Sequence, residues 1–133
     1  MKVTQVVPMF SVSNIEESIR YYIDGLGFQM TSKWVDKGKL RWCCLQHGGA
    51  ALMLQEFDSM PEGMPGQGVS IWFQCEDSLA LYREVSSKGI QARNPFVGNA
   101  SWDTMLTDRD GYVLHFTSPT DVPEGTEYSG QGA

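Results

Sequence analysis

The segment at residues 7–14 reads VPMFSVSN and leads into a helix-like pattern. Sixty-three residues later, the segment at 70–77 reads SIWFQCED and leads into a second such pattern. The halves also finish alike, since residues 49–55 read GAALMLQ and residues 111–117 read GYVLHFT. Such repetition indicates two copies of one supersecondary unit, each of which needs the other to complete a core or a site. We therefore predict that the protein binds its ligand between the two halves.

The composition is typical of one globular domain. The chain has 133 residues, of which 41% are hydrophobic and 11% aromatic, enough to bury a core. Its formal net charge of -6 disfavours nucleic acid as a partner, because phosphate binding draws on clustered cations and the sequence has no basic cluster. No stretch approaches the roughly 18 apolar residues of a membrane span, so we expect no membrane partner. Three cysteines cannot all pair within one chain, which favours a reducing, cytoplasmic location.

Hydrophobic periodicity predicts the same order of elements in each half. In the first half, Asn14 is placed as the N-cap of a helix whose apolar stripe is Ile15, Ile19, Tyr22, Ile23 and Leu26. Turn signals then separate three predicted strands, at residues 29–35, 40–46 and 50–56. The second half is predicted to contain a strand at 68–75, a helix capped by Asp77, and strands near 91–94, 101–107 and 112–117.

A single domain is predicted over residues 1–118. It consists of module one at about 5–57, a linker rich in Pro and Gly at 58–67, and module two at about 68–118. Residues 119–133 include Asp121, Glu124 and Glu127 but no Lys or Arg. We predict that they form an acidic flexible tail.

Alternation along the four central strands sorts their residues onto two faces. One set is large and apolar, as expected of a face packed under helices: Phe10, Val12, Leu52, Leu54, Ile71, Phe73, Cys75, Leu114 and Phe116. The other set mixes small, polar, sulfur and aromatic groups: Val7, Met9, Ser11, Ala51, Met53, Gln55, Ser70, Trp72, Gln74, Val113, His115 and Thr117. That mixture is typical of a concave ligand site. The alternative is a sheet face that packs against another subunit.

Four motifs occur in a familiar order: FSVSN at 10–14, the Tyr21-Tyr22 pair, GLGF at 25–28 and TDRDGYVLHF at 107–116. In this order the chain resembles the vicinal oxygen chelate superfamily over about residues 5–118. Members of that superfamily include glyoxalase I, extradiol dioxygenases, fosfomycin-resistance enzymes and bleomycin-resistance proteins. The resemblance implies an α+β fold of tandem β-α-β-β-β modules, whose mostly antiparallel sheet curves around a cavity. It does not assign the function, because one scaffold hosts several chemistries.

In metal-dependent members of the superfamily, four equivalent strand positions hold the metal, and the resemblance places Val7, Met53, Ser70 and His115 there. Only His115 is a usual metal ligand, whereas zinc and harder cations need three or more donors. We therefore predict no metal, no other cofactor and no catalytic residue. Two alternatives stay open. One is a shifted metal site that uses Gln55, Ser70 and His115, and the other is a divalent-metal-dependent lyase, isomerase or dioxygenase of the same superfamily.

The chain is most similar to the bleomycin-resistance type, which lacks the metal ligands and has His-Phe near the end of its last strand. Those proteins sequester a drug as dimers, in aromatic-lined grooves at the subunit boundary. For this chain the resemblance implies a homodimer that binds a small organic molecule, aromatic or cationic, without converting it. The predicted ligand-binding residues are Trp34, Trp42, Met53, Gln55, Ser70, Trp72, Trp102, Asp103 and His115.

For the tryptophans and for His115, more than one interpretation stays open. Some of the four tryptophans are expected to be core residues, and Trp72 is the one whose strand position argues best for the groove. His115 is either a hydrogen-bonded neutral imidazole or a group that holds the ligand or acts as a base. A purely structural or regulatory dimer, with its mixed sheet face buried, is a third reading of the whole chain.

Overall fold

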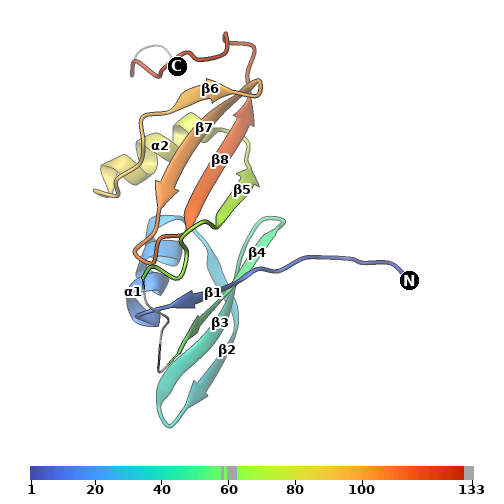
Figure 1. Cartoon of the computed structure of the whole chain (residues 1–133), viewed down its shortest axis with the longest axis vertical. Helices are drawn as coiled ribbons and strands as arrows, with labels where there is room; N and C mark the ends of the chain where they lie inside the picture. Colours follow the sequence, from blue (N-terminus) through green and yellow to red (C-terminus); the bar gives the residue numbers. More distant parts are fainter. Residues whose placement is uncertain (58, 60–62, 131–133) are drawn as a thin grey trace. The chain divides into compact units, whose positions relative to one another are not determined.

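The computed structural model describes residues 1–57, 59 and 63–130 (Figure 1). The chain divides into two compact units, Met1–Gln67 and Gly68–Ala133. Each unit contains one four-stranded sheet, with helical residues between its first two strands. The predicted α+β fold of two β-α-β-β-β modules is thereby confirmed. The predicted linker at 58–67 lies partly outside the described residues.

The first unit contains β1 (Met9–Val12), α1 (Ile15–Ile19), the π-helix η1 (Arg20–Gly25), β2 (Gln29–Asp36), β3 (Lys39–His47) and β4 (Ala50–Glu56). The strand order is β1-β4-β3-β2, with β1 parallel to β4 and the other neighbours antiparallel. Asn14 caps α1 as predicted, because its side-chain oxygen accepts a hydrogen bond from the Glu17 amide at 3.1 Å.

The predicted first helix is regular only over α1 and continues as the π-helix η1. In its last turn, the Leu26 amide donates to the Tyr21 carbonyl, five residues back, at 3.0 Å. Tyr22 lies in this segment and is fully buried, with ring centroids 6.2 Å from Phe10 and 6.0 Å from Phe28. These contacts fix the helical segment on the Phe10 side of the first sheet.

The second unit contains β5 (Ser70–Gln74), α2 (Ser78–Ser87), β6 (Phe96–Gly98), β7 (Ser101–Thr107) and β8 (Val113–Pro119), in the strand order β5-β8-β7-β6. Helix α2 packs on β7 and β8 and covers one face of the sheet (Figure 1). Asp77 caps it as predicted, accepting from the Ala80 amide at 3.0 Å. The second strand of this half, predicted near 91–94, is instead β6, because Pro95 has no amide hydrogen for a ladder bond before it. In the described residues, none of the helices is both long and apolar enough to cross a membrane.

The core lies where the sequence pattern places it. Of the nine predicted core-face residues, six are buried: Phe10, Val12, Leu52, Leu54, Leu114 and Phe116. The other three, Ile71, Phe73 and Cys75, are half-buried. These three belong to or follow β5, which is an edge strand of its sheet. The edge position alone does not account for this, because Phe10 and Val12 lie on β1, the edge strand of the first sheet, and are fully buried.

The segment after β8 is bound to β6 along much of its length. The Val97 amide donates to the Thr126 carbonyl at 2.9 Å, and the Tyr128 amide donates to the Pro95 carbonyl at 2.8 Å. The Glu124 carboxylate accepts from the amides of Asn99 and Ala100 at 2.8 and 2.9 Å. These bonds hold much of the predicted acidic tail against the second sheet, a pairing that its polar composition did not predict.

Candidate functional site

The strand register defines an open face of the second sheet, on the side away from α2. The Ser78 hydroxyl in α2 donates a hydrogen bond to the Thr104 hydroxyl in β7 at 2.8 Å. Helix α2 therefore covers the side of β7 that carries Thr104. Because side chains alternate along a strand, the paired Cα positions place the residues of the opposite side on one common face. This open face of the second sheet consists of Ser70, Trp72, Gln74, Phe96, Asp103, Met105, Thr107, Val113, His115 and Thr117.

Asp103 and His115 form a close pair on this face. The His115 Nδ1 atom lies 2.9 Å from one Asp103 carboxylate oxygen and 3.1 Å from the other. The Asp103 side chain is 4% exposed and that of His115 is 12% exposed. In the tautomer with the proton on Nδ1, the ring donates to the Asp103 carboxylate. The imidazole Nε2 atom is thereby left to interact with a ligand, as an acceptor in neutral imidazole or as a donor in the cation.

Trp72 covers the imidazole of His115. Their rings are parallel within 2°, with centroids 3.8 Å apart. The indole Nε1 atom of Trp72 donates to the Ser70 hydroxyl at 3.3 Å, which orients the ring. Trp72 is nevertheless 55% exposed. A large aromatic surface therefore remains accessible next to a buried, oriented His-Asp pair.

Trp102 lies on the other side of the second sheet. It pairs with Ser118 and Val97 and alternates with Asp103, so it belongs to the helix-covered face. Its ring packs edge-on against Tyr128, with centroids 6.1 Å apart. The structure thus separates Trp102 from Trp72 and His115. Asp103, expected beside a stacking tryptophan, is buried against His115 instead.

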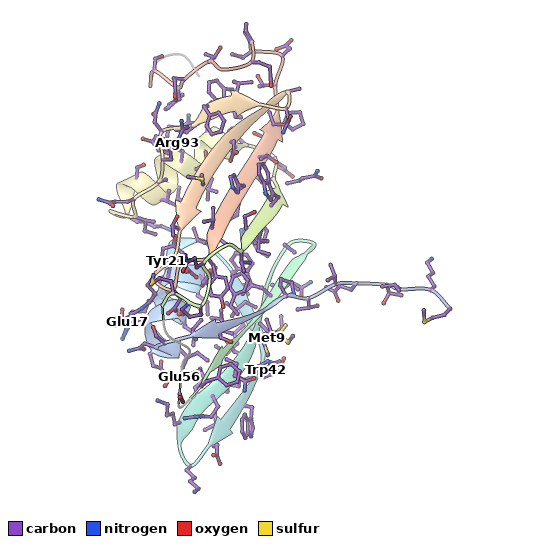
Figure 2. The ribbon with its side chains drawn as sticks, viewed as in Figure 1. Met9, Glu17, Tyr21, Trp42, Glu56 and Arg93 are labelled. Atoms are coloured by element: carbon purple, nitrogen blue, oxygen red, sulfur yellow. The ribbon has the colours of Figure 1, made fainter. Side chains whose placement is uncertain are left out.

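The remaining predicted site residues lie in the first unit. The Tyr22 contact with Phe10 marks the helix-covered side of the first sheet. The opposite, open face of the first sheet consists of Met9, Ser11, Ser32, Trp34, Trp42, Cys44, Met53 and Gln55. Trp34 and Met9 are 52% and 46% exposed, and Trp42 is half-buried. Figure 2 labels Met9 on β1 and Trp42 on β3, and these two strands flank β4.

The donors at the four matched positions do not make a metal site of the usual kind. Val7 precedes β1, Met53 offers a thioether, Ser70 a hydroxyl, and His115 alone an imidazole. Among the described residues, no group of three or more His, Cys, Asp or Glu side chains is arranged to hold a metal ion. Burial raises the pKa of the Cys43 thiol to about 11 and also raises that of Cys75, so neither supplies a thiolate at neutral pH.

Comparison with protein families identifies the class. The model of the glyoxalase/bleomycin resistance protein/dioxygenase superfamily matches residues 4–116. The chain belongs to this superfamily, as its motifs indicated. A comparison with curated protein sequences found no match.

Several solved structures share the fold of this chain at low sequence identity. TnmS3, an antibiotic binding protein from Streptomyces sp. CB03234, is 21% identical, with a TM-score of 0.72 over 90% of this chain and 99% of that chain. A bleomycin resistance determinant encoded on the transposon Tn5 is 21% identical, with a TM-score of 0.70 over 90% of this chain and 100% of that chain. TioX from Micromonospora sp. ML1 is 14% identical, with a TM-score of 0.70 over 87% of this chain and 99% of that chain.

Proposed function

We propose that this protein binds and sequesters a small organic molecule of aromatic character, in the manner of bleomycin-resistance proteins, without a metal ion. The observation that carries the proposal is the exposed indole of Trp72 over a His-Asp pair of fixed orientation. Such a group offers a flat surface for stacking beside a hydrogen-bonding atom, which is what small-molecule sites combine. The family and its antibiotic-binding members support the proposal.

The open face of the first sheet supports the same function. Trp34 and Trp42 are Cα partners on adjacent strands, and Gln55 pairs with Trp42. Indole surfaces with an amide beside them suit the aromatic and cationic ligands predicted from the sequence. We propose that the chain acts as a cytoplasmic homodimer. The three free thiols support a reducing location, and light scattering after size exclusion would measure the dimer.

Binding can be tested by equilibrium dialysis against a panel of aromatic and cationic antibiotics. Trp72→Leu removes the exposed stacking surface, and we expect it to weaken binding about tenfold, the effect of about 1.4 kcal/mol. Trp102→Leu is the matched control, because it removes an indole from the helix-covered face. Equal losses in both variants, or no binding of any compound by the wild-type protein, would contradict the proposal.

A metal-dependent lyase, isomerase or dioxygenase is the second candidate, and the Asp103–His115 pair is the observation that favours it. Metal-bound histidines commonly donate their second ring N–H to a carboxylate, as His115 does here. The test is metal analysis of protein purified without chelator. Stoichiometric metal that is lost in His115→Gln would support the enzyme and overturn metal-independent binding. Substoichiometric metal that His115→Gln does not change would support the binding protein.

A further inference from the structure

The outer edge of β6 is occupied by another part of the same chain. Strand β6 is an edge strand of the second sheet, and the segment that follows β8 runs alongside it (Figure 1). The Val97 amide donates to the Thr126 carbonyl, and the Val97 carbonyl accepts from the Gly125 amide, both at 2.9 Å. Sheets bind extended peptides in the same way, through main-chain hydrogen bonds at an edge strand. The outer edge of β6 therefore binds peptide backbone.

The turn between β6 and β7 binds a carboxylate of this segment. Asn99 and Ala100 adopt φ angles of 53° and 58°, the left-handed conformation of a two-residue hairpin turn. The amide of Asn99 donates to one Glu124 carboxylate oxygen at 2.8 Å, and the amide of Ala100 donates to the other at 2.9 Å. Successive amides in a turn form a concave site for an anion, and their bonds to a carboxylate are charge-assisted. The turn therefore selects an acidic side chain at this position of the segment.

Tyr128 is the aromatic anchor of the segment. Its ring packs edge-on against Trp102 and Tyr82, with centroids 6.1 and 5.7 Å away. A guanidinium nitrogen of Arg83 donates to its hydroxyl oxygen at 3.4 Å, and its amide donates to the Pro95 carbonyl at 2.8 Å. Edge-on aromatic pairs stabilise a contact beyond the area that they bury. The surface thus recognises an aromatic residue four positions after the acidic one, through side chains and main chain together.

Charge complementarity also favours an acidic occupant. Residues 120–128 contain three acidic side chains and no Lys or Arg, whereas they contact the guanidinium groups of Arg83 and Arg93. The pair between Arg93 and Glu127 is 3.4 Å long, and both side chains are about half exposed. Such an exposed pair adds little affinity. It contributes to specificity instead, because the two arginines would repel a basic segment.

All of these contacts are made by residues 124–128, which we call the EGTEY segment. Residues 120–123 connect it to β8, and Asp121 within this connection is exposed. Because the contacts do not depend on the connection, the EGTEY segment of another chain can make the same ones, as happens in domain swapping. The connection adds an effective concentration in the millimolar range, which favours the attached segment over a separate one.

We infer that the outer edge of β6 is a protein-interaction surface for an extended acidic segment, and that the partner it fits is the EGTEY segment of a second copy of this chain. Within one chain, the attached EGTEY segment occupies the surface and competes with the second copy. The inference goes beyond the proposed function, because the surface consists of the β6 main chain, the turn amides of Asn99 and Ala100, and rings outside the cluster of Trp72 and His115.

The test is rescue by a peptide, followed by nuclear magnetic resonance of the isotope-labelled full chain. Glu124→Gln/Tyr128→Ala weakens the attached EGTEY segment and should shift the amide signals of Asn99 and Ala100. A synthetic peptide with the sequence of residues 119–130 should return these signals towards their wild-type positions. We expect the peptide to bind the double variant about tenfold more tightly than the wild-type chain, in which the attached segment competes at millimolar effective concentration. The same peptide carrying both substitutions should rescue neither signal.

Asp121→Asn is the matched control, because it removes one carboxylate from the connection, where the side chain is exposed. It should leave the hydrogen-exchange rate of the Val97 amide unchanged. Glu124→Gln/Tyr128→Ala should raise that rate at least about tenfold, since the bond from this amide to Thr126 then opens more often. Equal exchange rates in the two variants would overturn the inference, as would a peptide that fails to rescue at millimolar concentration.

The second copy is tested as the partner with unlabelled wild-type chain in place of the peptide. It should shift the same amide signals of the double variant, but more weakly than the peptide does, because its own EGTEY segment is held within the chain. Rescue by the peptide without any rescue by the whole chain would show that a second copy is not the partner. Neither result bears on small-molecule binding at Trp72.

Discussion

The two halves place different chemistry on the same rung of the same ladder. In the first sheet, Met9 on β1 is the parallel partner of Met53 on β4. The equivalent rung of the second sheet pairs Trp72 on β5 with His115 on β8. Backbone pairing is therefore repeated, but two thioethers stand where the other half has a stacked indole and imidazole. This fold therefore repeats backbone positions, and the side chains alone decide which half carries polar chemistry.

The next rung extends the same contrast. Trp42 pairs with Gln55 in the first sheet, and Asp103 pairs with Thr117 at the equivalent place in the second. Only the second half has a carboxylate on this rung. It is that of Asp103, which is buried beside the His115 imidazole. A buried carboxylate depends on its partner for stability, so the second half should respond far more strongly to substitution on these rungs.

The largest expected effect is that of His115→Leu. It leaves the Asp103 carboxylate buried without its partner, and we predict a loss of about 3–5 kcal/mol in the free energy of unfolding. Met53→Leu, at the equivalent position of the first half, exchanges similar volumes and should cost less than about 1.5 kcal/mol. Urea unfolding followed by circular dichroism would measure both. Equal costs would show that the Asp-His pair contributes nothing specific.

A double substitution separates the pair from simple packing loss. In the His115→Leu/Asp103→Leu variant no buried charge remains, so its stability should recover much of what His115→Leu alone loses. Strictly additive costs of the two single substitutions would contradict the interaction between these side chains.

The halves also differ in the hydrogen bond that joins the last strand of each half to the start of its helix. In the first half, a Glu56 carboxylate oxygen accepts from the Ile15 amide at 2.8 Å, and the other accepts from Lys39 at 2.7 Å. In the second half, the Ser118 hydroxyl accepts from the Ser78 amide at 2.8 Å. Burial raises the pKa of Glu56, but the Ile15 amide and Lys39 together outweigh it, and the net pKa lies below its ordinary value. The equivalent bond of Ser118 involves no titrating group.

Lowering the pH should therefore weaken the bond of Glu56 to the start of α1 but not the bond of Ser118 to the start of α2. A carboxyl group whose pKa is lowered by folding stabilises the folded state above its unfolded pKa, and this stabilisation is lost as the pH falls through the folded value. We predict that Glu56→Ala costs about 2 kcal/mol near neutral pH and clearly less near about pH 3. Ser118→Ala should cost about 1–2 kcal/mol at both. Urea midpoints at the two pH values test this, and a constant cost of Glu56→Ala would contradict it.

The sequence predicted the fold well because the repeat constrains it. Alternation along the central strands identified the buried set, of which Leu52 and Leu114 are fully buried equivalents. The N-caps Asn14 and Asp77 were also correct, since a short polar side chain before an apolar stripe is a local signal. The π-helical turn was not predicted, because its hydrophobic spacing differs little from that of an α-helix over so few residues.

The arrangement of the candidate site could be predicted only in part, because it depends on the register between strands. Trp72 and His115 were assigned to one face by alternation, and the structure makes them partners. Asp103 was linked to Trp102 as its neighbour in sequence, although neighbours in a strand point to opposite faces. Counting outward from the β7–β8 turn pairs Thr107 with Val113 and therefore Asp103 with Thr117. That count was the available signal that brings Asp103 to the His115 side.

The smallest expected difference concerns the two helix caps. Asn14→Ala and Asp77→Ala each remove one side-chain acceptor, from the Glu17 and Ala80 amides at 3.1 and 3.0 Å, and each should cost about 1 kcal/mol. The helices that follow differ, since α1 has 5 residues before the π-helix and α2 has 10. Because a cap satisfies amides of the first turn only, helix length should not change its effect. Urea unfolding of both variants tests this. A cost for Asp77→Ala with none for Asn14→Ala would show that the Glu56 bond to Ile15 already holds the start of α1, and that the two halves differ at their caps as they do at their open faces.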